Sequence, residues 1–437
     1  MSYKQKKIIA VVPAKGTSSR IVSKNMKLLD GIPLFFYSIK KLLKSNIIDE
    51  VWLDTESEEI IDIVSDTNCK IFKRDVLFAD NKTDGNKLFL NEVENIESDI
   101  YIQLLATSPF IKLETIENGV KFLIDNLDAY DSIVLVNKQA LYTWDENGPV
   151  YDINNIPNSN DLTLTTIETM GMYISTKESA LKTKRRIGEK PFQLIATAEE
   201  AIDVNYPEEF KLANFIAAGK RELDRKLYNN LKHQLTSSAL SDILDDLGLT
   251  EQTTTSFTPN MKTKIFGRTK TLKLRRKKED EDFRKIYQAL HTYPTIIPGD
   301  IIVVENEVND LAYFGEMNAN LAIRSGAYGA LIAGKTRDSV EVENLNFPVF
   351  SSGFSCKDVR GRAVMESFNK TISFDGILVE NESLVFADSD GIVFIPIKFE
   401  KIILERMFET IQTENNIIND ISRGKTEVDI VNSHGDF

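Results

Sequence analysis

The apolar run at residues 8–12 and the loop that follows it constrain the fold of this chain more than any other segment. Five consecutive apolar residues predict a buried first strand of a sheet. The small and hydroxyl-bearing residues of the loop expose backbone N–H donors, and Arg20 and Lys24 add fixed positive charge. A helical pattern follows at residues 35–43. This order of strand, loop and helix predicts an α/β fold whose first loop can hold the phosphates of a nucleoside triphosphate.

Composition argues against several classes of protein. The chain has 437 residues, which is enough for two or three domains with full cores. Its net charge of −13 argues against non-specific binding of nucleic acid by the whole chain. The 2 cysteines lie far apart in sequence, and there are only 3 histidines. A disulfide framework, a His-rich metal site and a Ser-His-Asp triad are therefore not expected.

The ends and apolar runs of the chain predict a cytoplasmic location. Lys4, Lys6 and Lys7 lead into an apolar run of only about five residues, which is too short for a secretory signal peptide. No apolar run approaches the ~20 residues that a membrane-spanning helix needs. We therefore expect no membrane partner.

Strand-like and helix-like segments alternate in the first half of the chain. Strands are predicted at residues 8–12, 50–53, 100–105, 132–136 and 171–175, with helical patterns between them. This rhythm predicts a Rossmann-like, mainly parallel sheet with helices on both faces. The pattern becomes richer in strands after a polar, amphipathic stretch. We predict a first domain over residues 1–222, a connector helix over 223–234, and a second, different domain over 235–437 with a frayed tail from residue 420.

A series of short motifs runs through residues 6–220. They are Pro13-Ala14-Lys15-Gly16, Arg20, Lys24-Asn25, Gly31-Ile32-Pro33-Leu34, a segment at residues 54–60, Arg74, a segment at residues 103–109, and Asp203-Val204-Asn205. In this order and spacing the segment resembles the acylneuraminate cytidylyltransferases (CMP-sialic acid synthetases) and relatives that activate 3-deoxy-2-ulosonic acids. The resemblance implies a nucleotidyltransferase fold. It also implies transfer of CMP from CTP to the anomeric hydroxyl of a 2-keto sugar acid, with release of pyrophosphate.

The resemblance also implies roles for single residues. Lys15, Arg20 and Lys24 cradle the triphosphate, Gln103 positions the sugar acid, and Asp203 carries Mg²⁺ or Mn²⁺. Further residues are implied in substrate binding: Pro13, Ala14, Gly16, Asn25, Arg74, Ser108, Arg185 and Lys190. The chemistry requires such a set, because both substrates are anionic and cations must bring them together.

Two positions depart from the family pattern. Lys15 stands where the family has its leading arginine, which keeps the charge but loses the bidentate fork. Asn205 stands where the family has a second metal-binding acid, and an amide is a poorer Mg²⁺ ligand than a carboxylate. The metal site is therefore either rearranged around Asp203, or the activity is altered.

The second half carries another series of motifs, at residues 236–248, 267–271, 298–304, 315–322, 326–330, 334–341, 347–350 and 387–393. It resembles the RraA-like family, which includes class II pyruvate aldolases, and the resemblance implies a β/β/α domain. In the aldolase members an acid, twenty intervening residues and an Arg-Asp pair build the site, and Glu316, Arg337 and Asp338 have that spacing.

The aldolase resemblance implies a site for pyruvate or another 2-oxo acid. Arg337 would stabilise the enolate oxygen as the catalytic residue, and Asp338 would hold Mg²⁺ or Mn²⁺. The backbone amides after Gly315, in the segment Glu316-Met317-Asn318, would bind the carboxylate. A metal and a guanidinium together can stabilise an enolate without a Schiff-base lysine.

The joint function of the two halves has three alternatives. The second half can form the sugar acid that the first half activates, or it can be a non-catalytic module for oligomerisation or protein binding. In the third alternative both halves are degenerate and sense a nucleotide. The two resemblances imply a homo-oligomer, as a trimer or a hexamer.

Overall fold

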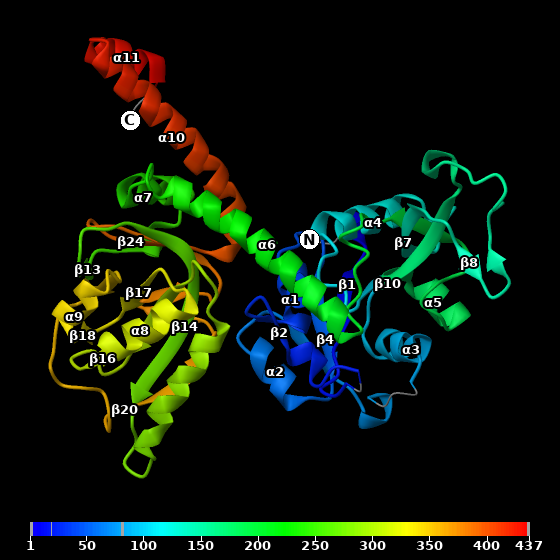
Figure 1. Ribbon diagram of the computed structural model, residues 1–437, viewed down its shortest axis with the longest axis horizontal. Helices are drawn as coiled ribbons and strands as arrows, with labels where there is room; N and C mark the ends of the chain where they lie inside the picture. Colours follow the sequence, from blue (N-terminus) through cyan, green and yellow to red (C-terminus); the bar gives the residue numbers. More distant parts are fainter. Residues whose placement is uncertain (1–2, 19, 80–82, 435–437) are drawn as a thin grey trace. The chain divides into compact units, whose positions relative to one another are not determined.

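The computed structural model describes residues 3–18, 20–79 and 83–434 (Figure 1). Its contacts divide the chain into two compact units, Met1–Ala217 and Ala218–Phe437. The boundary falls inside helix α6 (Pro207–Leu231), which includes most of the stretch predicted as a connector. Among the described residues, no helix combines the length and the apolar character that a membrane span requires.

The first unit is built on one open sheet with the strand order β11-β7-β10-β6-β1-β4-β5. Strand β10 runs antiparallel to β6 and β7, and the other neighbours are parallel. The predicted mainly parallel α/β sheet is confirmed. The strands are β1 (Ile8–Pro13), β4 (Glu50–Thr55), β5 (Lys70–Lys73), β6 (Ile100–Leu104), β7 (Ser132–Ala140), β10 (Leu164–Thr176) and β11 (Pro191–Ile195).

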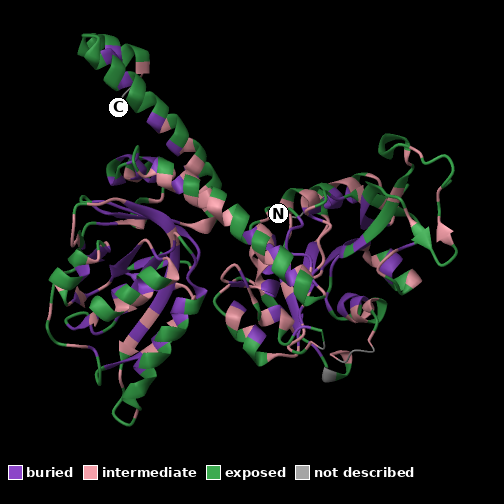
Figure 2. Ribbon diagram, in the orientation of Figure 1, coloured by how far each residue is buried: buried purple, intermediate pink, exposed green. Residues whose placement is uncertain are grey.

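Helices cover both faces of this sheet because its central strands are apolar on both sides. In β1, Ile8 and Ala10 pack in a core with residues of α1, α2 and α4, whereas Ile9 and Val11 pack in a core with residues of α3 and α5. Figure 2 shows the central strands as buried. The helices are α1 (Leu34–Leu42), α2 (Glu58–Val64), α3 (Gly85–Asn95), α4 (Leu113–Asp125) and α5 (Lys177–Thr183).

The carboxyl ends of three strands meet at one edge of this sheet. Val11 of β1 is in register with Gln103 of β6, and Pro13 of β1 is in register with Asp54 of β4. The loop after β1 therefore leaves the sheet beside Asp54 and Gln103. Ligands of open α/β sheets bind at this edge.

The second unit contains a large mixed sheet with the order β12-β24-β23-β14-β15-β17-β19-β13, and β20 pairs with the far end of the long strand β14. The strands are β12 (Thr253–Thr254), β13 (Thr258–Pro259), β14 (Ile265–Arg276), β15 (Ile301–Asn306), β17 (Gly329–Ile332), β19 (Val349–Ser351), β20 (Ala363–Phe368), β23 (Leu384–Ala387) and β24 (Ile392–Ile395). Its fold differs from that of the first unit, as predicted.

Helices and a second small layer cover the sheet of the second unit. Helices α8 and α9 and the 3₁₀ segment η6 pack on one face, and the strands β21 and β22 pack on the other. The helices are α7 (Ser237–Asp246), η6 (Phe283–Thr295), α8 (Glu316–Ser325), α9 (Ser339–Asn344), α10 (Glu400–Ser422) and α11 (Glu427–His434).

Short elements complete both units. The paired short strands are β2 (Leu28–Leu29) with β3 (Ile32–Pro33), β8 (Trp144–Asp145) with β9 (Gly148–Pro149), β16 (Ala312–Phe314) with β18 (Lys335–Thr336), and β21 (Ile372–Phe374) with β22 (Ile377–Val379). The other 3₁₀ turns are η1 (Tyr3–Gln5), η2 (Lys24–Met26), η3 (Val76–Phe78), η4 (Ser159–Asp161), η5 (Thr250–Gln252) and η7 (Ile397–Phe399).

A buried network of charged side chains lies inside the second unit. Lys270 of β14 is paired with Glu382 and lies 3.8 Å from Asp300. Arg221, from the second half of α6, lies 3.0 Å from Glu382 and 3.6 Å from Asp300. Burial raises the pKa of Asp300, and Lys270 opposes that shift. Two basic and two acidic groups thus compensate one another inside the core, which makes their burial tolerable.

The frayed tail predicted from residue 420 is wrong for the described part of the chain. Residues 420–422 end helix α10, and helix α11 follows. Asp420 Oδ2 lies 2.7 Å from Lys425 Nζ and 2.9 Å from His434 Nε2. These ion pairs order a polar segment that has few apolar residues. Residues 435–437, to which the prediction also extends, lie outside the described residues.

Candidate active sites

The loop after strand β1 is held by hydrogen bonds from its backbone and from Asn25. Gly16 N donates to Glu56 Oε1 over 2.7 Å, and Asn25 Nδ2 donates to Lys15 O over 2.8 Å. A Cβ on residue 16 would lie 2.9 Å from Ser57 Cβ, so this close approach requires glycine. The loop is therefore shaped by its own contacts before any ligand binds.

Lys24 reaches from this loop to the segment that precedes helix α6. Its Nζ donates to Val204 O over 2.9 Å and to Asn205 Oδ1 over 3.4 Å. Burial lowers the pKa of Lys24, and the neighbouring Arg20 and Lys15 cations lower it further. Lys24 thus lies close enough to two further predicted phosphate-binding cations to be repelled by them, which a bound polyphosphate would relieve.

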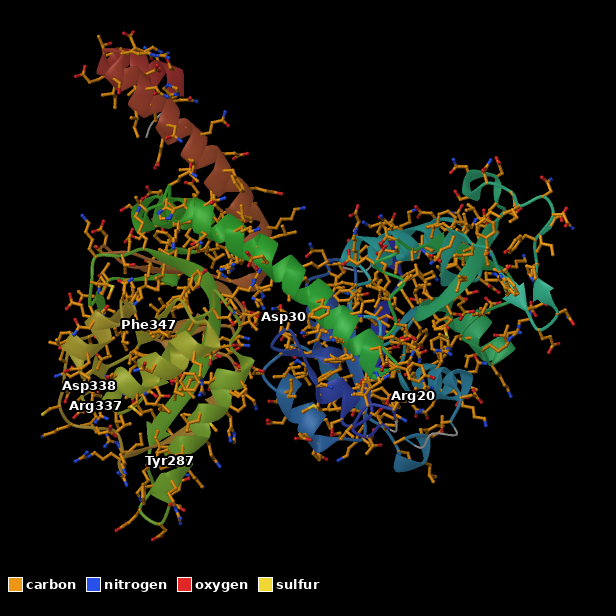
Figure 3. The ribbon with its side chains drawn as sticks, viewed as in Figure 1. Arg20, Asp30, Tyr287, Arg337, Asp338 and Phe347 are labelled. Carbon is orange, nitrogen blue, oxygen red and sulfur yellow. The ribbon has the colours of Figure 1, made fainter. Side chains whose placement is uncertain are left out.

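Arg20 and Glu209 fix the start of helix α6. The guanidinium Cζ of Arg20, which Figure 3 labels, lies 5.4 Å from the centre of the Tyr206 ring. Glu209 Oε2 accepts hydrogen bonds from the N–H groups of Asn205 and Tyr206, over 2.6 and 2.9 Å. Glu209 therefore caps this helix, and the carboxylate of Asp203 is not used as the helix cap.

Asp203 has one carboxylate oxygen engaged and one buried without a partner. Its Oδ2 accepts a hydrogen bond from Asn205 Nδ2, whereas Oδ1 has no hydrogen-bond partner in the described part of the chain. Burial raises the pKa of Asp203, and hydrogen bonding from the Thr107 and Asn205 side chains opposes that shift. A hard oxygen of this kind suits a divalent cation that takes its remaining ligands from phosphates and water. No group of three His, Cys, Asp or Glu side chains suited to a metal occurs among the described residues.

Gln103 and Arg74 belong to a deeper cluster at the same edge of the sheet. Arg74 Nε donates to Asp54 Oδ1 over 2.8 Å, and its Nη2 donates to Asp54 O over 2.9 Å. Gln103 Nε2 donates to Glu92 Oε2 over 2.8 Å. All four residues are buried. The guanidinium of Arg74, which was predicted to bind substrate, is thus hydrogen-bonded to Asp54 in this structure.

Arg186 is the cation that approaches Gln103. Its Nη1 lies 3.4 Å from Gln103 Oε1, and its Cζ lies 4.2 Å from the centre of the Tyr173 ring. Arg185 is exposed, and its N–H donates to Thr183 Oγ1 over 3.3 Å. The structure therefore brings Arg186, and not the predicted Arg185, next to Gln103.

The other predicted residues of the first unit lie at different depths. Pro13 ends β1, and Ala14 is buried directly after it. Ser108 is buried, and its Oγ has no hydrogen-bond partner among the described residues. Lys190 is exposed and precedes β11, at the amino ends of the parallel strands. Its backbone therefore lies at the edge opposite to the loop after β1.

Two residues of this site were missed from the sequence. Arg186 belongs to the basic run Lys184-Arg185-Arg186, and the sequence does not indicate which of these side chains faces the site. Glu92 carried a usable signal, because Phe89, Glu92, Val93 and Ile96 recur at the spacing of a buried helix face. An acid within such an apolar stripe indicates a buried carboxyl group that needs a partner.

In the second unit, the start of helix α8 faces Asp338. Glu316 N–H donates to Asp338 Oδ2 over 3.2 Å, and Arg337 Nε lies 3.5 Å from the same oxygen (Figure 3). A Cβ on residue 315 would lie 2.4 Å from Asp338 Oδ2, so this approach requires Gly315. Arg337 Nη1 also lies 2.6 Å from Asp358 Oδ2. The structure thus brings these four predicted residues together.

The side chains of Met317 and Asn318 point elsewhere, whereas the prediction for these residues concerns their backbone amides. The Met317 side chain is 75% exposed. Asn318 Nδ2 donates to Tyr313 O over 2.8 Å, and Tyr293 OH donates to Asn318 Oδ1 over 3.2 Å. Asn318 therefore ties helix α8 to the body of the unit.

A small pocket adjoins Arg337. Four of its lining residues are apolar, and Arg337, an asparagine and two hydroxyl-bearing residues add polar groups. The lining residues are Asn260, Phe314, Thr336, Arg337, Ser339, Val342, Val349 and Phe354.

The residue spacing of a phosphate-binding P-loop also occurs in the second unit, from Gly329 to Thr336. This segment forms strands β17 and β18, so its Lys-Thr end lies in a strand, and helix α9 begins only at Ser339. A P-loop needs a helix whose N-terminus faces the phosphates, so this match has no phosphate cradle.

Two stretches of the chain match models of known families. Residues 9–187 match the model described as Cytidylyltransferase, and residues 237–394 match the model described as Aldolase/RraA. A pseudaminic acid cytidylyltransferase of Campylobacter jejuni is 30% identical over 189 residues, which cover 40% of this chain and 81% of the relative. The chain belongs to the cytidylyltransferase family. The resemblances predicted for both halves are confirmed.

Two further relatives match one half each. The N-acylneuraminate cytidylyltransferase A of Danio rerio is 28% identical to this chain over 144 residues, which are 33% of each chain. The match thus spans about a third of that relative's length. A candidate 4-hydroxy-4-methyl-2-oxoglutarate aldolase of Halalkalibacterium halodurans is 26% identical over 173 residues, which cover 39% of this chain and 78% of the relative.

Proposed function

We propose that the first unit transfers CMP from CTP to a 2-keto sugar acid of the sialic (ulosonic) type and releases pyrophosphate. The observation that carries this proposal is the convergence of Lys24, its neighbours Lys15 and Arg20, and Asp203 at the carboxyl edge of the sheet. The names of the pseudaminic acid and N-acylneuraminate relatives support the class of acceptor.

The chemistry of this transfer requires management of negative charge. The anomeric hydroxyl of the sugar acid gives up its proton to water and its oxygen bonds to the α-phosphorus. The bond from the α-phosphorus to the bridging oxygen breaks, and pyrophosphate leaves with the electron pair. Lys24 and Arg20 would offset the charge that grows on the leaving group. Gln103 and Arg186 lie at the same edge and would hold the acid, with the guanidinium facing its carboxylate.

Mg²⁺ or Mn²⁺ belongs to this proposal at Asp203. The buried and unpartnered Oδ1 of Asp203 fits one ligand position of such an ion. Asn205 stands where the family has its second acid. Its Nδ2 donates a hydrogen bond to Asp203 Oδ2, and its Oδ1 accepts one from Lys24 Nζ. When bound, the ion would polarise the α-phosphate.

The test of this function follows pyrophosphate release from CTP and Mg²⁺ with a panel of ulosonic acids. Release that depends on one of the acids supports the proposal. CTP binding without release for any acid contradicts it and favours the alternative of a nucleotide sensor.

Replacement of Arg186 by leucine should raise the KM for the sugar acid about tenfold, because a hydrogen bond to a charged group contributes about 1.5–3 kcal/mol. The KM for CTP should change little. The matched control is Arg185→Leu, which removes the neighbouring, exposed guanidinium and should leave both KM values within about twofold. An equal effect of the two substitutions on the acid would contradict the assignment.

For the second unit we propose metal-dependent cleavage or formation of a carbon–carbon bond beside the ketone of pyruvate or a related 2-oxo acid. Arg337 at the pocket, with Gly315, Glu316 and Asp338 beside it, supports this proposal. Glu316 N–H and Arg337 both approach Asp338 Oδ2, so a hydrated Mg²⁺ or Mn²⁺ could bind the other oxygen of that carboxylate. Such a unit could form the acid that the first unit activates.

Replacement of Arg337 by methionine should lower the rate of oxaloacetate cleavage by about tenfold to a hundredfold, through loss of one charge-assisted hydrogen bond to the enolate. The matched control, Arg324→Met, removes an exposed arginine in the last turn of helix α8. Sedimentation of both variants reports the assembly state. A wild-type protein that assembles as a trimer or hexamer but cleaves no 2-oxo acid would favour the non-catalytic alternative.

A further inference from the structure

Glu92 is a buried acid that the proposed chemistry does not use. It lies on the inner face of helix α3 with 0% of its surface exposed, and Gln103 and Asp54 beside it are equally buried. Gln103 Nε2 donates to Glu92 Oε2 over 2.8 Å. Glu92 therefore contacts a predicted substrate-binding residue from the side that faces the core.

Asp54 is a neighbour of Glu92 in this cluster, and its carboxylate acts on the pKa of Glu92. Glu92 Oε1 and Asp54 Oδ2 are both buried, and neither receives a hydrogen bond from a donor in the described part of the chain. Two buried neighbouring carboxylates, each with an oxygen that lacks a donor, are both accommodated when they share one proton. Asp54 Oδ1 already accepts from Arg74 Nε over 2.8 Å, so the Arg74 guanidinium is paired with Asp54. The proton consequently belongs on Glu92.

Burial raises the pKa of Glu92 well above its usual value, and the charge of Asp54 raises it further. A protonated Glu92 donates through Oε1 to Asp54 and accepts through Oε2 from Gln103. Each carboxyl oxygen then has one defined role. This fixes the Gln103 amide, whose NH₂ group faces Glu92 and whose Oε1 faces Arg186 at 3.4 Å.

We propose that Glu92, held in its protonated form, is a positioning residue that locks the Gln103 amide with its carbonyl oxygen toward Arg186 and the sugar acid. The proposal rests on the function proposed for the first unit. Glu92 does not touch the substrate, and it acts only through Gln103.

Glutamine has the shape and the donor–acceptor pattern of protonated glutamate, so Glu92→Gln should preserve the arrangement. Its NH₂ group can donate to Asp54, and its carbonyl can accept from Gln103. In Glu92→Leu both neighbours lose their partner. We expect Glu92→Gln to keep the KM for the sugar acid within about twofold, and Glu92→Leu to raise it about tenfold with little change in the KM for CTP. Glu94→Gln, on the exposed side of the same helix, is the control.

A second readout does not depend on turnover. In the ¹⁵N-labelled full chain, the side-chain amide of Gln103 is identified by its loss in Gln103→Leu. This signal should be rigid in the wild type and in Glu92→Gln, and mobile in Glu92→Leu. If the wild-type chain releases no pyrophosphate, the proposed function fails while this comparison still decides the role of Glu92. An amide that is equally rigid in all three proteins, or a Glu92→Gln variant as impaired as Glu92→Leu, overturns the inference.

Discussion

Replacement of Lys24 by methionine is expected to lower kcat/KM for pyrophosphate release by on the order of 10³-fold, at the upper end of the loss seen when one preorganised group that stabilises transition-state charge is removed. Lys24 Nζ is held by Val204 O and Asn205 Oδ1, so its charge already stands beside Asp203 before CTP binds. Methionine keeps the length of the side chain and removes that charge. The measurement is the rate of pyrophosphate release at varied CTP.

The matched control is Lys27→Met, three residues further along the same loop. Lys27 Nζ lies 4.7 Å from the centre of the Phe210 ring, and no phosphate role is proposed for it. We expect its loss to change kcat/KM by less than about fivefold. Because burial lowers the pKa of Lys24, its charge is costly in the folded protein, and Lys24→Met should not lower the melting temperature. Equal losses in both variants would contradict the role of Lys24.

Replacement of Lys270 by methionine is expected to destabilise the second unit by about 3–5 kcal/mol, because removal of one partner of a buried ion network leaves uncompensated charge. Lys270 and Glu382 are paired inside the core, and Asp300 and Arg221 complete the network. In the variant, two carboxylates would share the single charge of Arg221. Chemical unfolding of the full chain measures the effect, with a separate transition for each unit.

Lys273→Met, on the same strand β14, is the control for this prediction. Lys273 is partly exposed and pairs with Glu305 at 3.3 Å and with Glu366 at 3.5 Å. Such a pair contributes about 0–1 kcal/mol. Pyrophosphate release by the first unit should persist in both variants. If Lys270→Met lowers the free energy of unfolding of the second unit by less than about 1 kcal/mol, the network does not stabilise the unit.

Much of the fold follows from local pattern. Each residue of β1 is apolar, and alternate side chains fill the cores on the two faces of the sheet. A strand that is apolar on both sides is typical of a parallel sheet covered by helices on both faces. Residues 8–12 and the later strand-like segments, which alternate with helical patterns, therefore predict the α/β class. The loop after β1 needs glycine at residue 16 and cations nearby, and both are visible as sequence.

The candidate sites are only partly readable in this way. Arg185 and Arg186 are neighbours with the same chemistry, and the stacking of Arg186 on Tyr173 distinguishes them. That contact joins two segments through the fold, and no local pattern encodes it. The same holds for the tail, where the pairing of Asp420 with Lys425 and His434 orders residues whose composition predicts fraying.

The amino-acid order alone determined the α/β class of the first half, the change of fold in the second half, and the two families to which they are related. These properties depend on the period of apolar residues and on short motifs, which are local. Only the tertiary structure decided which arginine faces Gln103 and which acids neutralise the buried charge of Lys270. It also supplies the surroundings from which we infer a protonated Glu92. Each of these depends on burial beside a residue that is distant in the chain, and burial is what makes an unpaired charge costly.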